Sequence, residues 1–320
     1  MTIFHYDLDK IVEGTHPLKK VAKLISFKSM MYRIKDVETS LGRTGYGLEV
    51  GLKCLFLQFF YDMSDRQAEE RIRYNMAMRW FLGFEIDDQT PDHSFFGRTR
   101  KTLGTSRIHK LLQVINKKAK KKGIMKELFV FADASAIKAK ETTWSQRDKA
   151  LAQGEEKLNN DNIDKHSSDK DARFGCKGKN KFWYGYKRNS SVDMCSGLVD
   201  KTAVTPANIP DEQAFARICP KNSIVFADKA YCLKPAQIAM KINGCVSAAI
   251  LKKNMLGKNK DQDRWRAQLR APYENIFSKV NHKTRYRGLA KVQMQAVLEA
   301  LVFNVNRLIK LNSPPLFVGA

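Results

Sequence analysis

Two aspartates stand directly after short apolar stretches, in a position where a carboxylate could do chemistry. Asp133 follows the stretch at 128–132, and Asp228 follows the stretch at 224–227. A charge at the end of a buried strand costs free energy unless it is paired or binds a metal ion. A single acid in this position more often caps the next helix, but two acids in matched surroundings favour a shared site. The carboxyl ends of such strands are also where sites usually lie.

Glu274 is the third acid that could belong to this site. It is the only acid between Asp263 and Glu299, and basic residues surround it. Pro272 can open a helix, which predicts Glu274 in the first turns of that helix. A carboxylate there also suits the helix dipole or an arginine partner. Oxygen ligands are nevertheless what Mg²⁺ requires, and two such ions bridged by carboxylates cleave phosphodiesters.

Histidine and cysteine offer no competing metal site in the sequence. The six cysteines and six histidines are dispersed, without a C-x-x-C or an H-x-x-x-H pair. Zinc sites and redox motifs need closely spaced ligands, so we expect the thiols to be reduced and mostly buried.

The net charge indicates a polyanionic partner. The chain has 57 Lys and Arg against 33 Asp and Glu, which gives a formal charge of +24. Nucleic acid is the usual partner of such a chain, although a generally basic, soluble surface is the alternative. No apolar stretch approaches the roughly 18 residues of a membrane span, and the N-terminus lacks the order of a signal peptide. We therefore expect a cytoplasmic, nucleoid-associated protein that contacts no membrane.

The positive charge is gathered into two blocks, as contacts with DNA phosphates require. Residues 101–122 hold eight basic residues and no acid, and residues 252–291 hold twelve basic residues and three acids. The candidates for phosphate contact are Lys118, Lys121 and Lys122 in the first block, and Arg270, Lys279, Lys283, Arg285 and Arg287 in the second.

The elements of the first third are helical. Residues 47–61 are too long and too apolar for a strand, which predicts a buried helix. Ser64 and Gln67 have capping-box spacing, and Thr90 with Pro91 predicts the start of another helix. Short helices on a basic chain suit a helix-turn-helix-like unit, so we expect a helical DNA-binding domain over 1–122. A purely structural helical cap is the alternative.

Strands dominate the rest of the chain. Candidate strands lie at 128–132, 182–188, 197–204, 223–227 and 245–251, with helices at 210–218 and 291–310. This order predicts an α/β (α+β) sheet domain over 123–311. Residues 141–171 carry eight acids and five bases, which indicates a mobile polar insertion at about 141–180.

Several ordered blocks resemble bacterial insertion-sequence transposases with a DDE catalytic domain, of the IS-five/IS-four-like group. The stretch 47–102, with Met63-Ser-Asp-Arg-Gln and Trp80-Phe-Leu-Gly-Phe, is similar to the N-terminal helical domain of that group. Seven further blocks resemble its catalytic domain, at 131–139, 185–188, 191–199, 205–211, 227–231, 273–277 and 285–289. The resemblance covers nearly the whole chain beyond about residue 45.

The resemblance implies an RNase H-like mixed sheet flanked by helices and preceded by an all-α domain. It implies that Asp133, Asp228 and Glu274 are catalytic and hold two Mg²⁺ (or Mn²⁺) ions. The implied reaction is cleavage and strand transfer of double-stranded DNA, with the terminal inverted repeats of the element and a target DNA as partners. The chain is expected to be a homodimer on DNA.

The third block departs from the pattern of the group. Related enzymes often have Tyr three residues before the Arg of an Arg-x-x-x-Glu pair, and Lys seven residues after the Glu. Arg270 and Glu274 match, but Ala267 and Asn281 stand at the flanking positions, so the phosphate contact falls to either Lys279 or Lys283. Two alternatives remain: an RNase H-like nuclease without strand transfer, and a transposase-derived, sequence-specific DNA-binding regulator. The three intact acids count against the regulator.

Overall fold

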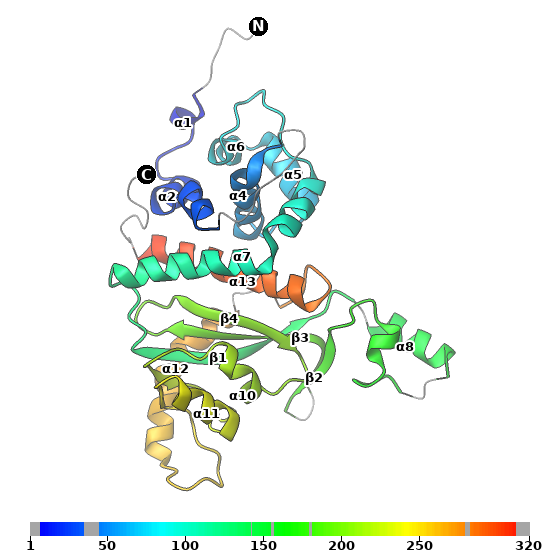
Figure 1. Ribbon diagram of the computed structural model, residues 1–320, viewed down its shortest axis with the longest axis vertical. Helices are drawn as coiled ribbons and strands as arrows, with labels where there is room; N and C mark the ends of the chain where they lie inside the picture. Colours follow the sequence, from blue (N-terminus) through cyan, green and yellow to red (C-terminus); the bar gives the residue numbers. More distant parts are fainter. Residues whose placement is uncertain are drawn as a thin grey trace. The chain divides into compact units, whose positions relative to one another are not determined.

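The computed structural model describes residues 7–34, 45–141, 143–154, 157–178, 181–278 and 282–311. The chain divides into two compact units, one of Met1–Lys122 with Leu298–Ala320 and one of Gly123–Val297. Helix α13, Leu289–Lys310, contributes residues to both units. The domain predicted from sequence over 123–311 contains this whole helix. Figure 1 shows both units, coloured along the chain.

The described part of the first unit is helical, as predicted. Helix α4, Gly47–Phe60, buries the apolar stretch that predicted it, including Leu52, Leu55 and Phe56. The other helices that lie wholly in this unit are α1 (Leu8–Ile11), α2 (Pro17–Leu24), α3 (Phe27–Met31), η1 (Tyr32–Ile34), α5 (Asp65–Tyr74), α6 (Met76–Leu82) and α7 (His93–Lys121).

Two helix starts test the capping predictions. The capping box before α5 is confirmed, because Ser64 Oγ accepts from the Gln67 amide at 3.3 Å and Gln67 Oε1 accepts from the Ser64 amide at 2.9 Å. The prediction that Thr90 caps the next helix is wrong. Asp92 is the N-cap of α7, since its carboxylate accepts from the Phe95 amide at 2.9 Å. The short aspartate side chain satisfies the first free amides as well as a threonine does.

Helix α7 bends at a glycine, and its second half shares a buried polar contact with α13. Gly104 has φ 66° and ψ 164°, a conformation that side chains with a Cβ rarely adopt. Further along, Asn304 Nδ2 donates to Asn116 Oδ1 at 2.9 Å, and both residues are buried. A fragment that ends at Lys122 would leave Asn116 without this partner, so the first unit needs the C-terminal helix.

The second unit is built on a mixed six-stranded sheet. Its strands are β1 (Phe129–Lys138), β2 (Arg173–Lys177), β3 (Lys181–Asp193), β4 (Val199–Pro206), β5 (Ile224–Phe226) and β6 (Val246–Ser247). Their order is β2-β3-β1-β5-β6, with β4 also paired to β3. Strand β3 is antiparallel to its three neighbours, whereas β1–β5 and β5–β6 are parallel. This confirms the expected mixed sheet.

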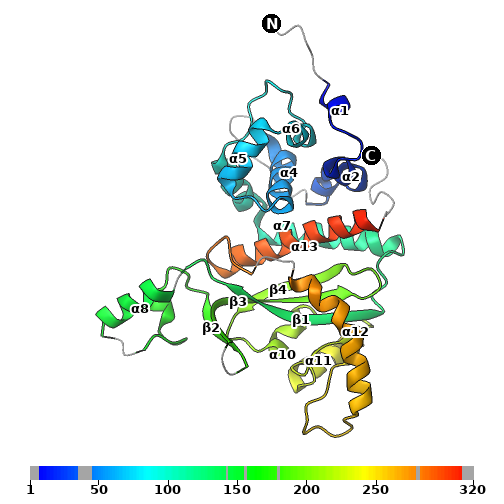
Figure 2. The same ribbon diagram turned by 180° about the vertical axis from the view of Figure 1, so that it is seen from behind.

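Helices cover both faces of this sheet (Figure 2). One apolar cluster packs Ala132 of β1 against α11 (Lys234–Ile242) and η2 (Phe215–Arg217). A second cluster packs Ile137 of β1 against the first part of α13. Strand alternation places these two β1 residues on opposite faces.

The remaining helices are α8 (Thr143–Ala152), α9 (Ile163–His166), α10 (Asp211–Ala214) and α12 (Lys260–Ser278). No helix in the described ranges has both the length and the apolar character to cross a bilayer.

Several sequence predictions need correction. Strand β1 continues past Asp133 to Lys138 because its antiparallel pairing with β3 extends that far, so Asp133 lies within the strand. Strand β6 has two residues where 245–251 was expected. Strand β2 and helix α11 were not predicted. Strand β2 lies within the expected insertion, and its pairing with β3 makes that part of it an edge of the sheet.

The helix that carries Glu274 begins earlier than predicted. Helix α12 starts at Lys260, and Pro272 lies inside it. The side chain of Asn259 accepts from the amides of Asp261 and Gln262, at 2.9 and 3.2 Å. Asn259 is therefore the N-cap of this helix, and the prediction that Pro272 opens the helix is wrong.

Candidate active site

Strand pairing brings Asp133 and Asp228 to neighbouring positions. The parallel register of β1 and β5 ends at the pair Phe131 and Phe226. Asp133 lies two residues after Phe131, and Asp228 lies two residues after Phe226. Asp228 then forms a tight turn, since its Oδ1 accepts from the Ala230 amide at 2.9 Å. The two carboxylates therefore share one end of the parallel part of the sheet.

Burial gives Asp133 an unusual proton affinity. Desolvation, together with a smaller contribution from the negative charge of Asp228, raises the pKa of Asp133 from its ordinary 3.8 to about 6. The Ala134 amide and the charges of Lys177 and Arg270 act in the opposite direction. A carboxylate whose charge is only partly compensated in this way suits a bound cation.

Helix α12 packs on β1 beside Asp133. The Arg270 guanidinium is buried and lies 5.5 Å from the centre of the Phe131 ring. The Tyr273 ring is 6.1 Å from the same ring, and its hydroxyl donates to the Met194 carbonyl. Because residues two apart on a strand share a face, Phe131 and Asp133 point to the same side. These contacts fix α12 on the face of β1 that carries Asp133.

Glu274 does not join the two aspartates in this structure. Its side chain is 56% exposed and lies 3.4 Å from Arg270, one helical turn away. In the parts of the chain that the structure describes, no three His, Cys, Asp or Glu side chains are close enough to hold a metal ion together. The structure therefore brings two of the three predicted acids together and pairs the third with Arg270.

Tyr231 is a site residue that sequence reasoning missed. It is fully buried, its ring packs on Phe215 with 5.4 Å between centres, and its hydroxyl has no hydrogen-bond partner among the described residues. Burial raises the pKa of Tyr231, and the charges of Asp211, Asp133 and Asp228 raise it further. The sequence block 227–231 contains this tyrosine, but nothing in it shows that its hydroxyl is unpaired.

Replacing Tyr231 with phenylalanine is expected to leave the free energy of unfolding unchanged or to raise it. A buried hydroxyl without a partner costs about 1–3 kcal/mol, and Tyr231→Phe removes it without changing the ring. Tyr186→Phe is the matched control, because this equally buried tyrosine donates to Asp169 at 2.6 Å. That variant should lose about 1–3 kcal/mol. Urea unfolding measures the free energy of unfolding of both variants. A loss of stability for Tyr231→Phe as large as that for Tyr186→Phe would contradict the expectation.

The lysines at the end of α7 form a compact positive group. Lys121 and Lys122 are exposed. Burial lowers the pKa of Lys118, and the charges of Arg33, Lys122 and Lys121 lower it further. The mutual repulsion of these positive charges would be reduced by a bound anion such as phosphate.

The segment after α12 is tied to the insertion. Arg287 Nε lies 2.5 Å from Glu141 Oε1, and that glutamate is almost completely buried. The Gly288 and Leu289 amides donate to Asp169 and Asp171, at 3.1 and 2.8 Å. The Arg285 amide donates to Gln295 at 2.8 Å, and Lys283 is exposed. Lys279 lies outside the described residues.

The ion pair with Glu141 gives the predicted DNA contact of Arg287 a direct test. We expect Arg287→Ala to lower the midpoint of urea unfolding, because the buried Glu141 carboxylate keeps its serine hydrogen bonds but loses its positively charged partner. We expect the salt dependence of DNA affinity to stay within a few tenths of the wild-type slope. A true phosphate contact would instead reduce that slope by roughly one unit, which a binding series in rising salt measures. Lys283→Ala is the comparison, since its exposed side chain is free to reach a phosphate.

Comparison with known families identifies the chain. The family model described as "Transposase DDE domain" matches residues 125–305. The model described as "Transposase domain (DUF772)" matches residues 6–102. The first match alone covers more than half of the chain, and the chain belongs to the DDE transposase family. Neither match assigns it to the IS-five or the IS-four-like group.

Solved transposase structures show only a distant likeness. A piggyBac transposase synaptic complex with hairpin DNA has 6% identity and a TM-score of 0.39, covering 92% of this chain and 74% of that chain. A Mos1 transposase paired-end complex with left transposon end has 7% identity and a TM-score of 0.20, covering 91% and 88%. Similarities this low add nothing to the family assignment.

Proposed function

We propose that this transposase cuts double-stranded DNA at the terminal inverted repeats of its own element and joins the freed end to a target. The observation that supports this most is the pair Asp133 and Asp228 at the end of two adjacent parallel strands, inside a transposase DDE domain. In the first step the oxygen of water bonds to phosphorus and the 3′ oxygen leaves. In the second, the oxygen of that 3′-hydroxyl bonds to a phosphorus of the target strand and gives up its proton to water, while the target's own 3′ oxygen leaves that phosphorus.

The residues fit divalent cations with oxygen ligands. Asp133 and Asp228 would hold the cation, and Glu274 would complete the set once its side chain leaves Arg270. When bound, two Mg²⁺ or Mn²⁺ ions supply Lewis acidity and a water of lowered pKa. Arg270 would then remain beside Asp133 as a fixed positive charge facing the phosphate.

The basic groups support a role in holding DNA. Lys118, Lys121 and Lys122 would contact phosphates from the first unit, and Lys283 and Arg285 from the second. Two chains bound to the two ends of one element would form a homodimer on DNA.

The proposal is tested with the full-length protein and DNA that carries the terminal repeats. In Mg²⁺ we expect cleavage at the repeat ends but not at scrambled ends, and joined products with a supercoiled target plasmid. Cleavage without end preference or joining would identify a nuclease instead. End binding without cleavage in either Mg²⁺ or Mn²⁺ would identify a DNA-binding regulator.

A further inference from the structure

The loop between β6 and α12 presents an apolar side chain in a basic setting. Leu256 is 99% exposed. Residues 252–260, which we call the tip loop, hold Lys252, Lys253, Lys258 and Lys260 and no acid. A leucine so fully surrounded by water gains free energy from any apolar environment that it can enter.

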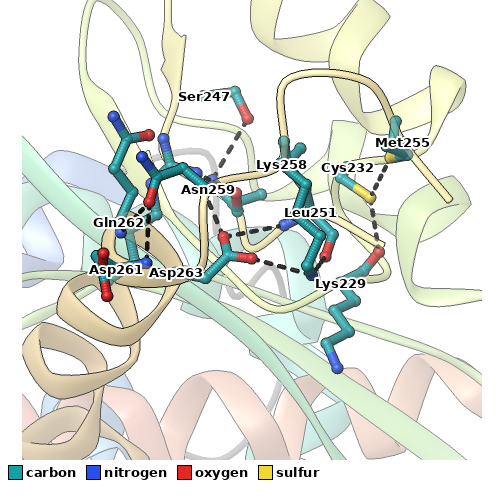
Figure 3. Close-up of polar contacts among 12 residues, drawn as sticks. Lys229, Cys232, Ser247, Leu251, Met255, Lys258, Asn259, Asp261, Gln262 and Asp263 are labelled. Carbon is teal, nitrogen blue, oxygen red and sulfur yellow. Dashed lines mark hydrogen bonds and ion pairs between the residues drawn. The ribbon is translucent and has the colours of Figure 1, made fainter. Parts of the chain in front are cut away.

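The two ends of the tip loop are held together from its base (Figure 3). Asp263 accepts from the Leu251 amide at 3.4 Å and lies 3.1 Å from Lys258. Lys258 Nζ also donates to the Leu251 carbonyl at 2.9 Å. Asn259 then caps α12. These contacts hold the two ends of the tip loop in place. Less conformational entropy is therefore lost when the exposed part of the loop contacts a partner.

The tip loop touches the turn that carries Asp228. Met255 Sδ lies 3.2 Å from Cys232 Sγ, and that thiol donates to the Lys229 carbonyl at 3.0 Å. Figure 3 shows Met255, Cys232 and Lys229 together on this side of the loop. Lys229 directly follows Asp228. A DNA strand with a phosphate at Asp228 would therefore pass next to the tip loop.

The first turns of α12 extend the same surface. Lys260, Arg264 and Trp265 are all exposed there. The Trp265 ring is 6.1 Å from that of Phe226, which lies two residues before Asp228. Positive side chains mixed with apolar ones are typical of a DNA surface, because phosphates need the charges and unstacked bases need the apolar groups.

We propose that the tip loop binds the duplex next to the scissile phosphate, with Leu256 entering between adjacent bases and Lys253 on a flanking phosphate. Apolar wedges of this kind unstack a base step and bend the helix. DNA is favoured over a second copy of the chain because the tip loop holds four lysines and no acid, so that two such loops repel each other. This inference rests on the proposed function.

The test uses full-length protein and element-end duplexes with 2-aminopurine at successive positions near the cleavage site, in a chelator so that no cleavage occurs. Base unstacking raises the fluorescence of this analogue. We expect wild-type protein to raise it at one or two positions, and Leu256→Ala to abolish the rise while weakening binding by roughly tenfold. Leu151→Ala, at another exposed leucine of the second unit, should leave both unchanged.

The outcomes separate this inference from the function on which it rests. End-specific binding and cleavage without a fluorescence rise, or the same rise with Leu256→Ala, overturns the wedge alone. Wild-type protein that does not bind the ends overturns both. A salt slope unchanged by Lys253→Ala overturns the phosphate contact. A change of the DNA-free protein's sedimentation with Leu256→Ala would show that the tip loop joins two chains instead.

Discussion

Asp133→Asn, Asp228→Asn and Glu274→Gln are each expected to cleave element-end DNA in Mg²⁺ about 10³-fold more slowly than the wild type, or not at all. Metal ions supply several kcal/mol of transition-state stabilisation, and every 1.36 kcal/mol corresponds to about a tenfold change in rate. Each substitution keeps the shape of the side chain and removes a charged ligand. End affinity should stay within a few-fold of the wild type, because DNA is held mainly by cations elsewhere.

Single-turnover cleavage and end binding are measured on the same preparations. Asp148→Asn, at an exposed acid of α8, is the control and should cleave at the wild-type rate. Glu274→Gln carries the most weight, because this side chain faces Arg270 in the structure and not the aspartates. Near-wild-type cleavage by any one variant would remove that residue from the proposed triad. Equal loss of binding and cleavage would indicate a folding defect.

Asp133 and Asp228 could be predicted as site residues from the sequence for a physical reason. A buried strand of a parallel pair reads as a continuous apolar run, so an acid that interrupts it is conspicuous. The strand register that makes Asp133 and Asp228 neighbours could not be predicted, because the pairing of β1 with β5 joins distant parts of the chain. Strand β1 also continues past its acid, since β3 and not local hydrophobicity decides where it ends.

Glu274 shows how a local signal can mislead. Pro272 is a good first residue of a helix, yet the helix that contains it was already started by Asn259. The earlier cap was hidden in a lysine-rich stretch that reads as loop.

The ion pair of Arg287 with Glu141 is a second limit of sequence reading. Clustered charge predicted a phosphate contact for this arginine, but a buried acid in the distant insertion neutralises it. Charge counts along a chain do not show which cations already have partners in space. The tip loop has the opposite character, because Lys253, Lys260 and Leu256 are exposed.

Metal-free protein is expected to become less stable as pH rises from about 4 to 7, in part because of Asp133. Its pKa rises from 3.8 to about 6 on folding, so the folded state binds the proton more tightly than the unfolded state. Stability from this group is therefore fully present below about pH 4 and is lost as pH rises through 6. The corresponding free energy is about 1–3 kcal/mol, since partial exposure reduces the full value.

Asp133→Asn removes this dependence without changing the shape of the side chain. In a chelator, the variant should gain about 1–3 kcal/mol over the wild type at pH 7.5 and almost nothing at pH 4. Urea unfolding at the two pH values measures the difference. Asp161→Asn, at an exposed acid of the same unit, should show no such change.

Mg²⁺ should stabilise the wild type at pH 7.5 and leave the stability of Asp133→Asn almost unchanged. A ligand that binds only the folded state stabilises it by RT ln(1 + [L]/Kd), so saturating Mg²⁺ should restore wild-type stability at pH 7.5. The same Mg²⁺ should have little effect on Asp133→Asn, which lacks the ligand. Below pH 6 the effect on the wild type should also fade, because a protonated carboxyl does not coordinate a cation. Equal stabilisation of both proteins by Mg²⁺ at pH 7.5 would show that the cation binds away from Asp133.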